Sequence, residues 1–287
     1  MPYYLAAAEA SGADRPEFVV PTGNFGDAFA GWAARKIGGN VGHLHAAVNQ
    51  NDALNQAINH GLYVRHRAVE SASVSMDVQA PSNFERLVFE ASGRSVEGTK
   101  GLFDAFHATG HVHLSPDLQA ALKGQVTAST ISEAETAETI LLAHQRWGKV
   151  ICPHTAVALA AALKRDKPSS SKAIGQKDAQ AQIVLATAHP AKFPEFVTKA
   201  LGFAPEVPEA IERLHGLKET IRELANDDGE ALKAFRGVCG VADRWARGPL
   251  RRGLRGRSRP RAPRHLSRNG VPAAQGRRKR GRVALRL

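Results

Sequence analysis

Apolar residues in the first 60 positions occur in short runs, and segments of mixed composition separate them. Two runs, Glu17–Pro21 and Leu44–Val48, have the length and apolar character of strands that are buried on both faces of a sheet. The mixed segments after them, residues 28–37 and 51–59, are expected to be helices, and Gly38-Gly39 is expected to end the first of these. A strand, turn, helix, strand and helix within about 45 residues indicate the α/β class.

The pattern farther along the chain predicts more helices and one more strand. Ser82 and Ser132 are each followed three positions later by a glutamate, Glu85 and Glu135, which is the signature of a capping box at the start of a helix. Residues 62–81 have a poorer pattern and are expected to form a long loop. The other expected elements are helices at residues 3–11, 83–91, 133–147, 154–165, 193–201, 208–224 and 230–235, a strand at 182–187 and a surface loop at 167–172.

Charge is distributed very unevenly along the chain. The formal net charge of +12 over 287 residues would by itself suggest a nucleic-acid-binding protein. Residues 237–287, however, hold 16 of the 39 Lys and Arg residues and one of the 27 Asp and Glu residues, a net charge of +15, so that residues 1–236 carry −3. The first 236 residues therefore have the charge of an ordinary, mildly acidic globular protein.

The tail at residues 237–287 consists largely of Arg, Gly, Pro and Ala. It has too few apolar residues to build a core, so we expect it to be disordered. Three interpretations are open: a sequence read in a shifted frame from GC-rich DNA, which we rank first, a solvated tail, and an arm that binds nucleic acid through contacts between arginine and phosphate. Trp245 is its one Phe, Tyr or Trp residue, which does not favour stacking on single-stranded nucleic acid.

Several classes of protein are excluded by composition. The two cysteines, Cys152 and Cys239, are too few for a disulfide framework or a cysteine-based zinc site. We expect neither a membrane span nor a signal peptide, because no apolar run approaches about 18 residues and the N-terminus lacks the charged and apolar regions of a leader. The cytoplasm is the expected location. The histidines at positions 43, 45, 60 and 66 lack acidic partners at ligand spacing and are expected at the surface, with no metal site.

The segment Pro21–Asp27, Pro-Thr-Gly-Asn-Phe-Gly-Asp, is the strongest local signal of chemistry. A strand ends there, Gly23 and Gly26 allow a tight turn, and a helix begins, so that backbone N–H groups can surround a phosphate. Asn24 can donate from its amide, and Asp27 is expected to cap the helix. The spacing matches neither a P-loop nor the G-x-G-x-x-G fingerprint, and by itself it leaves both a phosphate site and an ordinary strand-to-helix turn open.

This segment also resembles a known family. Val19–Gly31 resembles the cofactor-phosphate loop of threonine synthases, which are pyridoxal-phosphate enzymes of fold type II, the tryptophan-synthase-β-like class. Four more blocks resemble the same family in the same order: Ala47–Asp52, Ser75–Arg86, Pro153–Ala158 and Ala186–Phe193. The resemblance implies that residues 1–236 form an incomplete, C-terminal catalytic region with an open, mostly parallel sheet and helices.

The resemblance also implies roles for individual residues. Gly23, Asn24, Phe25 and Asp27 would line the site of the 5′-phosphate of pyridoxal 5′-phosphate. Thr155 would place its hydroxyl against the pyridine nitrogen of the cofactor, where a hydroxyl can hydrogen-bond a neutral nitrogen. Without the family, Thr155 is an ordinary threonine in the first turn of an alanine-rich helix. Cys152 stands where the family has an aspartate, and we interpret it as a small apolar substitute.

One residue that the family requires is missing from these 287 residues. The resemblance places the lysine that forms the Schiff base with the cofactor upstream of the phosphate loop, whereas the first lysine here is Lys36, downstream of Gly23. No residue of this chain is therefore assigned as catalytic. We expect the chain to correspond to the C-terminal half of a threonine synthase, to be inactive by itself and to expose apolar edges of an incomplete sheet.

The function implied by the resemblance is the last step of threonine biosynthesis. In that lyase reaction, O-phospho-L-homoserine and water give L-threonine and phosphate. The main alternative is a non-catalytic fragment whose basic tail, residues 237–287, binds nucleic acid. A related fold-type-II lyase is a further alternative, but it would share the phosphate loop without the blocks around Ser82–Arg86 and Pro153–Ala158.

Overall fold

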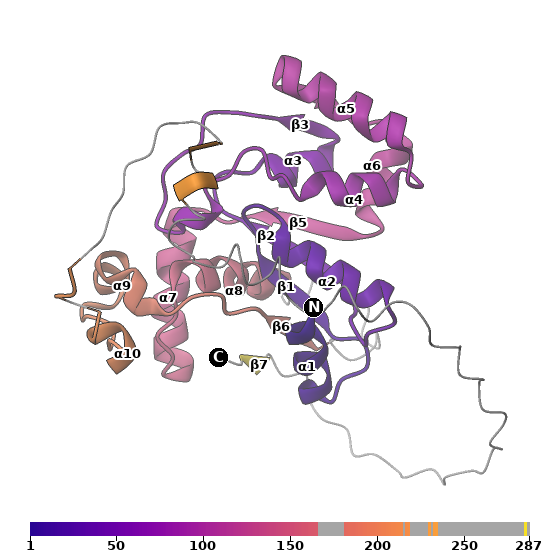
Figure 1. Cartoon of the computed structure of the whole chain (residues 1–287). Coiled ribbons are helices and arrows are strands. Elements are labelled where there is room, and N and C mark those ends of the chain that lie inside the picture. Colours follow the sequence, from indigo (N-terminus) through magenta and orange to yellow (C-terminus); the bar gives the residue numbers. More distant parts are fainter. Residues whose placement is uncertain (166–180, 215, 219–228, 231, 235–283, 286–287) are drawn as a thin grey trace, which may run out of the picture. The chain divides into compact units, whose positions relative to one another are not determined.

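The computed structural model describes residues 1–165, 181–214, 216–218, 229–230, 232–234 and 284–285. Its main sheet is open, and the strand order is β5-β2-β1-β6-β7 (Figure 1). The strands are β1 (Glu17–Pro21), β2 (Leu44–Val48), β5 (Val126–Thr130), β6 (Gln182–Val184) and β7 (Ala284–Leu285). All neighbouring strands pair in parallel, which confirms the expected open parallel sheet and the α/β class.

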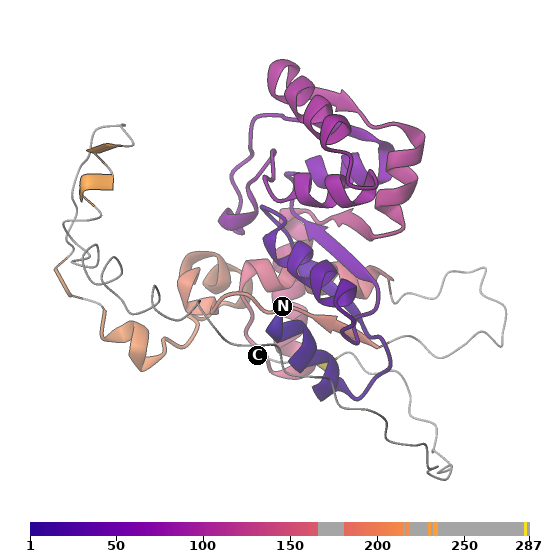
Figure 2. The same ribbon diagram turned by 45° about the vertical axis from the view of Figure 1, so that its right-hand side comes forward.

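Helices cover both faces of this sheet (Figures 1 and 2). Side chains alternate along each strand, so successive residues pack against the helices of opposite faces. Phe18 and Val20 of β1 join a buried cluster that includes residues of α1 (Pro2–Ser11) and α2 (Gly26–Lys36). Val19, between them, joins a second cluster built largely from the helices of the other face. These helices are α7 (Glu133–Trp147), α8 (Pro153–Arg165) and α9 (Pro194–Leu201).

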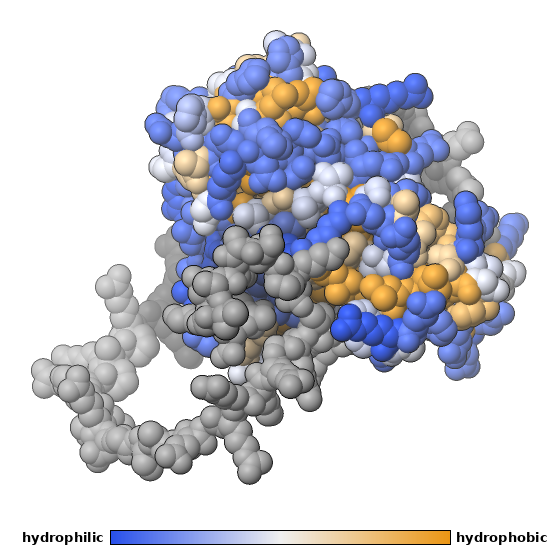
Figure 3. Space-filling view, turned by 180° about the vertical axis from the view of Figure 1, so that it is seen from behind, coloured by the Kyte–Doolittle hydropathy of each residue, from blue (hydrophilic) through white to orange (hydrophobic). Residues whose placement is uncertain are grey.

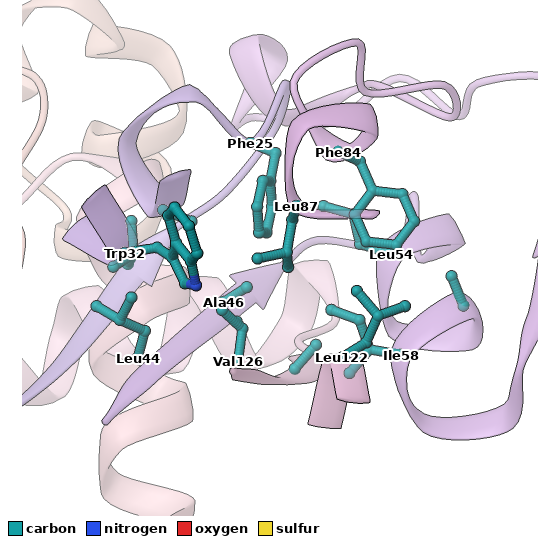
Figure 4. Packing of buried hydrophobic residues seen from close by; sticks show 14 of the residues in the cluster. Phe25, Trp32, Leu44, Ala46, Leu54, Ile58, Phe84, Leu87, Leu122 and Val126 are labelled. Carbon is teal, nitrogen blue, oxygen red and sulfur yellow. The ribbon is translucent and has the colours of Figure 1, made fainter. Parts of the chain in front are cut away.

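A smaller group of elements extends the first cluster. Strands β3 (Leu62–Val64) and β4 (His111–His113) form a two-stranded antiparallel sheet. The surrounding helices are α3 (Ala53–His60), α4 (Phe84–Ala91), α5 (Val96–Thr109) and α6 (Pro116–Lys123). In the core between α2 and α4, the rings of Phe25 and Phe84 meet edge to face with centroids 5.8 Å apart (Figure 4).

The expected elements in the first half of the chain are largely confirmed. The helices expected near residues 3–11, 28–37, 51–59 and 83–91 appear as α1 to α4, with ends shifted by one or a few residues. The expectation that residues 62–81 are only loop was wrong, because they contain β3 and the short 3-10 helix η1 (Val74–Met76). Nothing was predicted between residues 92 and 131, where α5, β4, α6 and β5 lie.

Helix starts show where local signals succeed. The capping box at Ser132 and Glu135 is present at the start of α7, so that prediction is confirmed. The capping box at Ser82 and Glu85 is wrong: α4 begins at Phe84, its cap is Asn83, and Ser82 makes a longer-range contact instead. A side chain at a helix start can bond either locally or across the fold, and the sequence alone does not distinguish these.

The second half agrees in outline. Helices α7, α8 and α9 match their expected ranges, and β6 is shorter than the strand expected at 182–187. Of the helix expected at 208–224, the described part contains α10 (Glu209–Glu212), and residues 230 and 232–234 are helical as expected. The loop expected at 167–172 lies outside the described residues. So does the tail at 237–287, except for β7, which pairs with β6.

The chain divides into two compact units, the first of which contains residues 1–208 together with β7. The described part of the second consists of α10 and the residues that follow it, and all the features below belong to the first. Seen from behind, the described surface is mostly hydrophilic and carries separate apolar areas (Figure 3). Among the large hydrophobic side chains of the described residues, Tyr3 of α1 and Ile37 after α2 are 84% and 68% exposed.

Candidate functional site: a cavity at the end of strand β1

A cavity of about 420 Å³ lies where β1 ends and α2 begins. In open α/β sheets, ligands bind at the carboxyl ends of the strands, so this is the position at which a site is expected. The cavity brings together the strand-to-helix loop, η1, the first turn of α8 and the segment after β6. The lining residues are those from 21 to 28, Ser75, Met76, Asn83, His154, Thr187, Ala188, Lys192 and Phe193.

The loop between β1 and α2 has the backbone of an anion site. Phe25, the residue before α2, has a φ of +64°, and its buried ring packs in the core while its backbone turns the chain into the helix. Phe29 donates its N–H to the carbonyl of Phe25, but among the described residues no acceptor bonds the N–H groups from Gly23 to Ala28. These donors and the positive end of the α2 dipole favour a bound anion.

Asn24 is oriented by the segment that follows the long loop. Its Oδ1 accepts from the N–H of Ser82 at 2.6 Å and from the Ser82 hydroxyl at 3.1 Å, and its carbonyl accepts from Nδ2 of Asn83 at 3.0 Å. Because Oδ1 is occupied, the Nδ2 group of Asn24 is left to donate, which agrees with the role expected for it. The Ser82-Asn83 motif therefore supports the loop from outside.

Gly23 is required by close contact between two backbone segments. A Cβ at this position would lie 2.2 Å from the carbonyl oxygen of Ser75 and 3.0 Å from the Cα of Met76. Ser75 and Met76 belong to η1, which forms the wall of the cavity opposite the loop. Because residue 23 has no side chain, the loop can approach the backbone of η1 this closely.

The η1 segment is held by a buried polar network around Asp77. Oδ1 of Asp77 accepts from Nδ2 of Asn49 at 2.7 Å, from Nδ2 of Asn51 at 3.0 Å and from the Ser71 hydroxyl at 2.6 Å. Its Oδ2 accepts from the Ser71 N–H at 3.0 Å. The Ala47–Asp52 and Ser75–Arg86 blocks that resemble one family therefore meet in space, where they fix the wall of the cavity.

We expect the Asp77→Asn substitution to lower the free energy of unfolding by about 2 kcal/mol, because one carboxylate oxygen that faces only donors becomes a donor itself. Chemical denaturation of the full chain measures this change. Asp52→Asn is the matched control, because an amide oxygen can still accept from Nε2 of Gln56 as the Asp52 carboxylate does. An equal loss in both variants would contradict the role of the Asp77 network.

His154 is a site residue that the sequence analysis did not select. It is 5% exposed, lines the cavity, and its Nε2 accepts from the backbone N–H of Ser75 at 3.3 Å. Burial, with a contribution from the charge of Lys192, lowers the pKa of His154 below its ordinary value, while Asp77 opposes the shift. The imidazole is therefore neutral near pH 7. Its place beside Thr155 in the Pro153–Ala158 block was the available signal.

Thr155 and Cys152 lie behind the cavity rather than on its lining. Thr155 is buried in α8, its hydroxyl lies 3.2 Å from the sulfur of Cys152, and its N–H donates to that sulfur at 3.4 Å. The interpretation of Cys152 as merely apolar was incomplete, because its sulfur accepts a helix-start N–H, the usual task of a capping side chain.

Asp27 differs from its expected role, and Arg86 lies outside the cavity lining. Asp27 lines the cavity, but α2 begins at Gly26 with Phe25 as its cap, so the prediction that Asp27 caps the helix was wrong. Its carboxylate stands in the first turn, where the helix dipole favours a negative charge. Arg86 lies with its guanidinium 5.8 Å from the ring of Phe29 and is not among the lining residues.

The histidines expected at the surface divide into two groups. His60 and His66 are exposed, whereas His43 is half-buried and His45 is 2% exposed, so the expectation was wrong for His45 and holds only in part for His43. His45 bonds to Thr127 and Ser129 of the neighbouring strand β5, each at 2.8 Å. The described part of the chain contains no group of three or more His, Cys, Asp or Glu residues that could hold a metal ion, and none of its helices is long and apolar enough to cross a membrane.

Comparisons with known proteins agree on one family. The model of the family described as "Threonine synthase, C-terminal" matches residues 155–235. Threonine synthase of Pseudomonas aeruginosa is 36% identical over 228 residues, which cover 78% of this chain and 47% of that protein. Human threonine synthase-like 2 is 35% identical over 208 residues, which cover 71% of this chain and 40% of that protein.

Solved structures give the same result. The crystal structure of threonine synthase with bound pyridoxal phosphate from Brucella melitensis superimposes with a TM-score of 0.71 at 36% identity. The match covers 82% of this chain and 49% of that one. The chain thus spans about half the length of the relatives and structures that it matches.

Proposed function

Because this chain is a homologue of threonine synthases that spans about half of their length, we propose that it forms the part of such an enzyme that holds the phosphate of pyridoxal 5′-phosphate. The observation that carries the proposal is the cavity at the end of β1, where the N–H groups from Gly23 to Ala28 lack acceptors among the described residues. When bound, the cofactor supplies an electron sink for carbanion chemistry at an amino acid.

The residues of the loop fit a phosphate group. The N–H groups of Gly23, Asn24 and Phe25 and the amide of Asn24 donate to phosphate oxygens, and the start of α2 adds its positive dipole end. Asp27 is repelled by a phosphate, so its carboxylate has to remain in solvent, in agreement with its exposed position. The similarity to a structure with bound pyridoxal phosphate supports this assignment.

Two residues of α8 extend the proposed site. His154 presents a neutral imidazole to the cavity wall and holds η1 through Ser75. Thr155 is proposed to hydrogen-bond the pyridine nitrogen of the cofactor. For this its hydroxyl must turn away from the sulfur of Cys152, a rotation about one side-chain bond.

The reaction proposed for the complete catalytic unit converts O-phospho-L-homoserine and water to L-threonine and phosphate. It needs an amine that binds the cofactor and moves protons. No lysine precedes the loop in these 287 residues, since the first is Lys36. We therefore propose that these 287 residues bind the cofactor but do not turn over substrate without an amine supplied from outside them.

Ligand binding tests the proposal directly. Calorimetric titration of the full chain with pyridoxal 5′-phosphate is expected to show at least about tenfold tighter binding than titration with pyridoxal, because the phosphate makes charge-assisted hydrogen bonds. Equal affinities would contradict the assignment of the loop. Phosphate release from O-phospho-L-homoserine with added cofactor is expected to stay at the uncatalysed rate for these 287 residues, and release above that rate would contradict the need for an amine from outside them.

A further inference from the structure

Lys192 is the one lysine or arginine among the described residues that line the cavity at the end of β1. It lies in the short 3-10 helix η2 (Pro190–Lys192), more than 160 positions after the loop that carries the N–H donors. The other residue with a formal charge on the lining is Asp27. A dianion in this cavity would therefore be repelled by the carboxylate of Asp27, and the ammonium of Lys192 would be the one positive side-chain charge on the lining to attract it.

The backbone around Lys192 is held in place by local bonds. The ring Nδ1 of His189 accepts from the N–H of Ala191 at 3.2 Å, and the carbonyl of Pro190 accepts from the N–H of Phe193 at 2.9 Å. The ring of Phe193 lies against that of His154, with centroids 4.9 Å apart. Lys192 is thus placed on a supported turn beside the cavity wall, and it is exposed.

Lys192 also stands where two cavities meet. A second cavity, of about 530 Å³, shares Lys192 and Phe193 with the first and is otherwise lined by Glu133, Lys199 and other residues of α9 and of the segment before η1. In the part of the chain that the structure describes, Lys192 forms no ion pair. Its ammonium is therefore available to a ligand that enters either cavity.

The charge of Lys192 already acts on the site. Burial is the main cause that lowers the pKa of His154, and the charge of Lys192 adds to it, so the histidine does not supply a second positive charge. Among the described lining residues, only Lys192 then brings a positive side-chain charge to a phosphate, so that both donor and acceptor of its hydrogen bond are charged. The backbone donors position the phosphate, and Lys192 supplies the charge.

From this geometry we propose that Lys192 binds a phosphate monoester at the site and makes the site selective for phosphorylated ligands. The proposal rests on the proposed function, since it assigns the charge partner of the same site. Two sources carry this chemistry: the 5′-phosphate of pyridoxal phosphate in the first cavity, and the phosphate of O-phospho-L-homoserine entering through the second. Both ligands take part in the reaction proposed above, and binding experiments distinguish which phosphate Lys192 binds.

Binding by variants of the full chain tests the role of Lys192. Dissociation constants are measured by calorimetry for pyridoxal 5′-phosphate, pyridoxal, O-phospho-L-homoserine and L-homoserine. Lys192→Gln is expected to weaken binding of at least one phosphorylated ligand by about 10- to 100-fold, because a charged hydrogen bond is lost, and to leave its unphosphorylated counterpart unchanged. Lys192→Arg is expected to recover most of the affinity.

The matched control is Lys199→Gln, which removes a lysine that lines only the second cavity. It is expected to leave the affinity for pyridoxal 5′-phosphate within about twofold of that of the unchanged chain, as a surface substitution does. A loss confined to pyridoxal 5′-phosphate assigns Lys192 to the cofactor phosphate, and a loss confined to O-phospho-L-homoserine assigns it to the substrate phosphate.

Two results would overturn the inference, and they are distinguishable. If the unchanged chain prefers phosphorylated ligands and Lys192→Gln keeps the full preference, the role of Lys192 fails while the proposed function stands. If the unchanged chain shows no preference for phosphate, both fail together. Lys192 is exposed, so the variants are expected to fold, and unchanged circular dichroism spectra confirm that binding is compared between folded proteins.

Discussion

Gly23→Ala is expected to abolish detectable binding of pyridoxal 5′-phosphate and to lower the free energy of unfolding by about 3 kcal/mol. The new Cβ would lie 2.2 Å from the carbonyl oxygen of Ser75, a backbone atom that cannot move aside as a flexible side chain can. Either the loop or η1 has to shift, and both line the cavity. Denaturation and calorimetric titration of the full chain measure the two effects.

Gly26→Ala is the control, because the same loop offers a glycine whose added Cβ would meet only Nδ2 of Asn83, at 3.6 Å. Gly26 begins α2, so alanine is expected to leave the free energy of unfolding unchanged or to raise it by a few tenths of a kcal/mol. Equal destabilisation by the two substitutions would show that the approach between Gly23 and Ser75 does not determine the site.

Stability is expected to fall steeply as the pH decreases from 6.5 towards 3. Burial is the main cause that lowers the pKa of His45 from 6.5 to about 3, and the charges of Arg165 and His43 add to it. Between these two values the unfolded chain binds a proton that the folded chain does not, so acid favours unfolding. From pH 6.5 to 5 this one group is expected to remove about 2 kcal/mol.

His45→Gln tests this origin. The variant loses the titrating group, so its free energy of unfolding is expected to decrease less over pH 6.5 to 5, by about 2 kcal/mol compared with the unchanged chain. The interval lies above the range in which ordinary carboxylates titrate. His60→Gln, at an exposed position, is the control and should keep the original pH dependence. Parallel curves for all three proteins would exclude His45 as the cause.

Local pattern predicted the elements that carry their own start and stop signals. The two short apolar runs form β1 and β2 as predicted, and Ser132 and Glu135 form the predicted capping box. Strand β5, Val-Thr-Ala-Ser-Thr, was missed because it lies at the sheet edge and only alternate residues are buried. The capping box predicted at Ser82 was wrong because Ser82 bonds to Asn24, 58 positions away in the sequence, and not to the start of its own helix.

The candidate site shows the same division. The Pro21–Asp27 segment could be selected as a candidate from the sequence, since a strand, glycines and a helix start are adjacent there, and the structure places it on the lining of a cavity. His154 and Lys192 were not selected, because a lone histidine or lysine has no local pattern that distinguishes it from a surface residue. Their place in the site depends on α8 and η2 packing beside the end of β1.

By itself, the sequence determined the α/β class, most helices and strands outside residues 92–131, the glycine-containing motif at Pro21–Asp27 and the resemblance to threonine synthases, because each depends on residues close together in the chain. Only the tertiary structure decided that Gly23 is needed for contact with Ser75, that His45 is buried and that Lys192 lines the same cavity as the loop. These three facts depend on contacts between distant segments. Such contacts arise from parallel strand pairing and from the packing of helices on both faces of the sheet, which a local pattern does not contain.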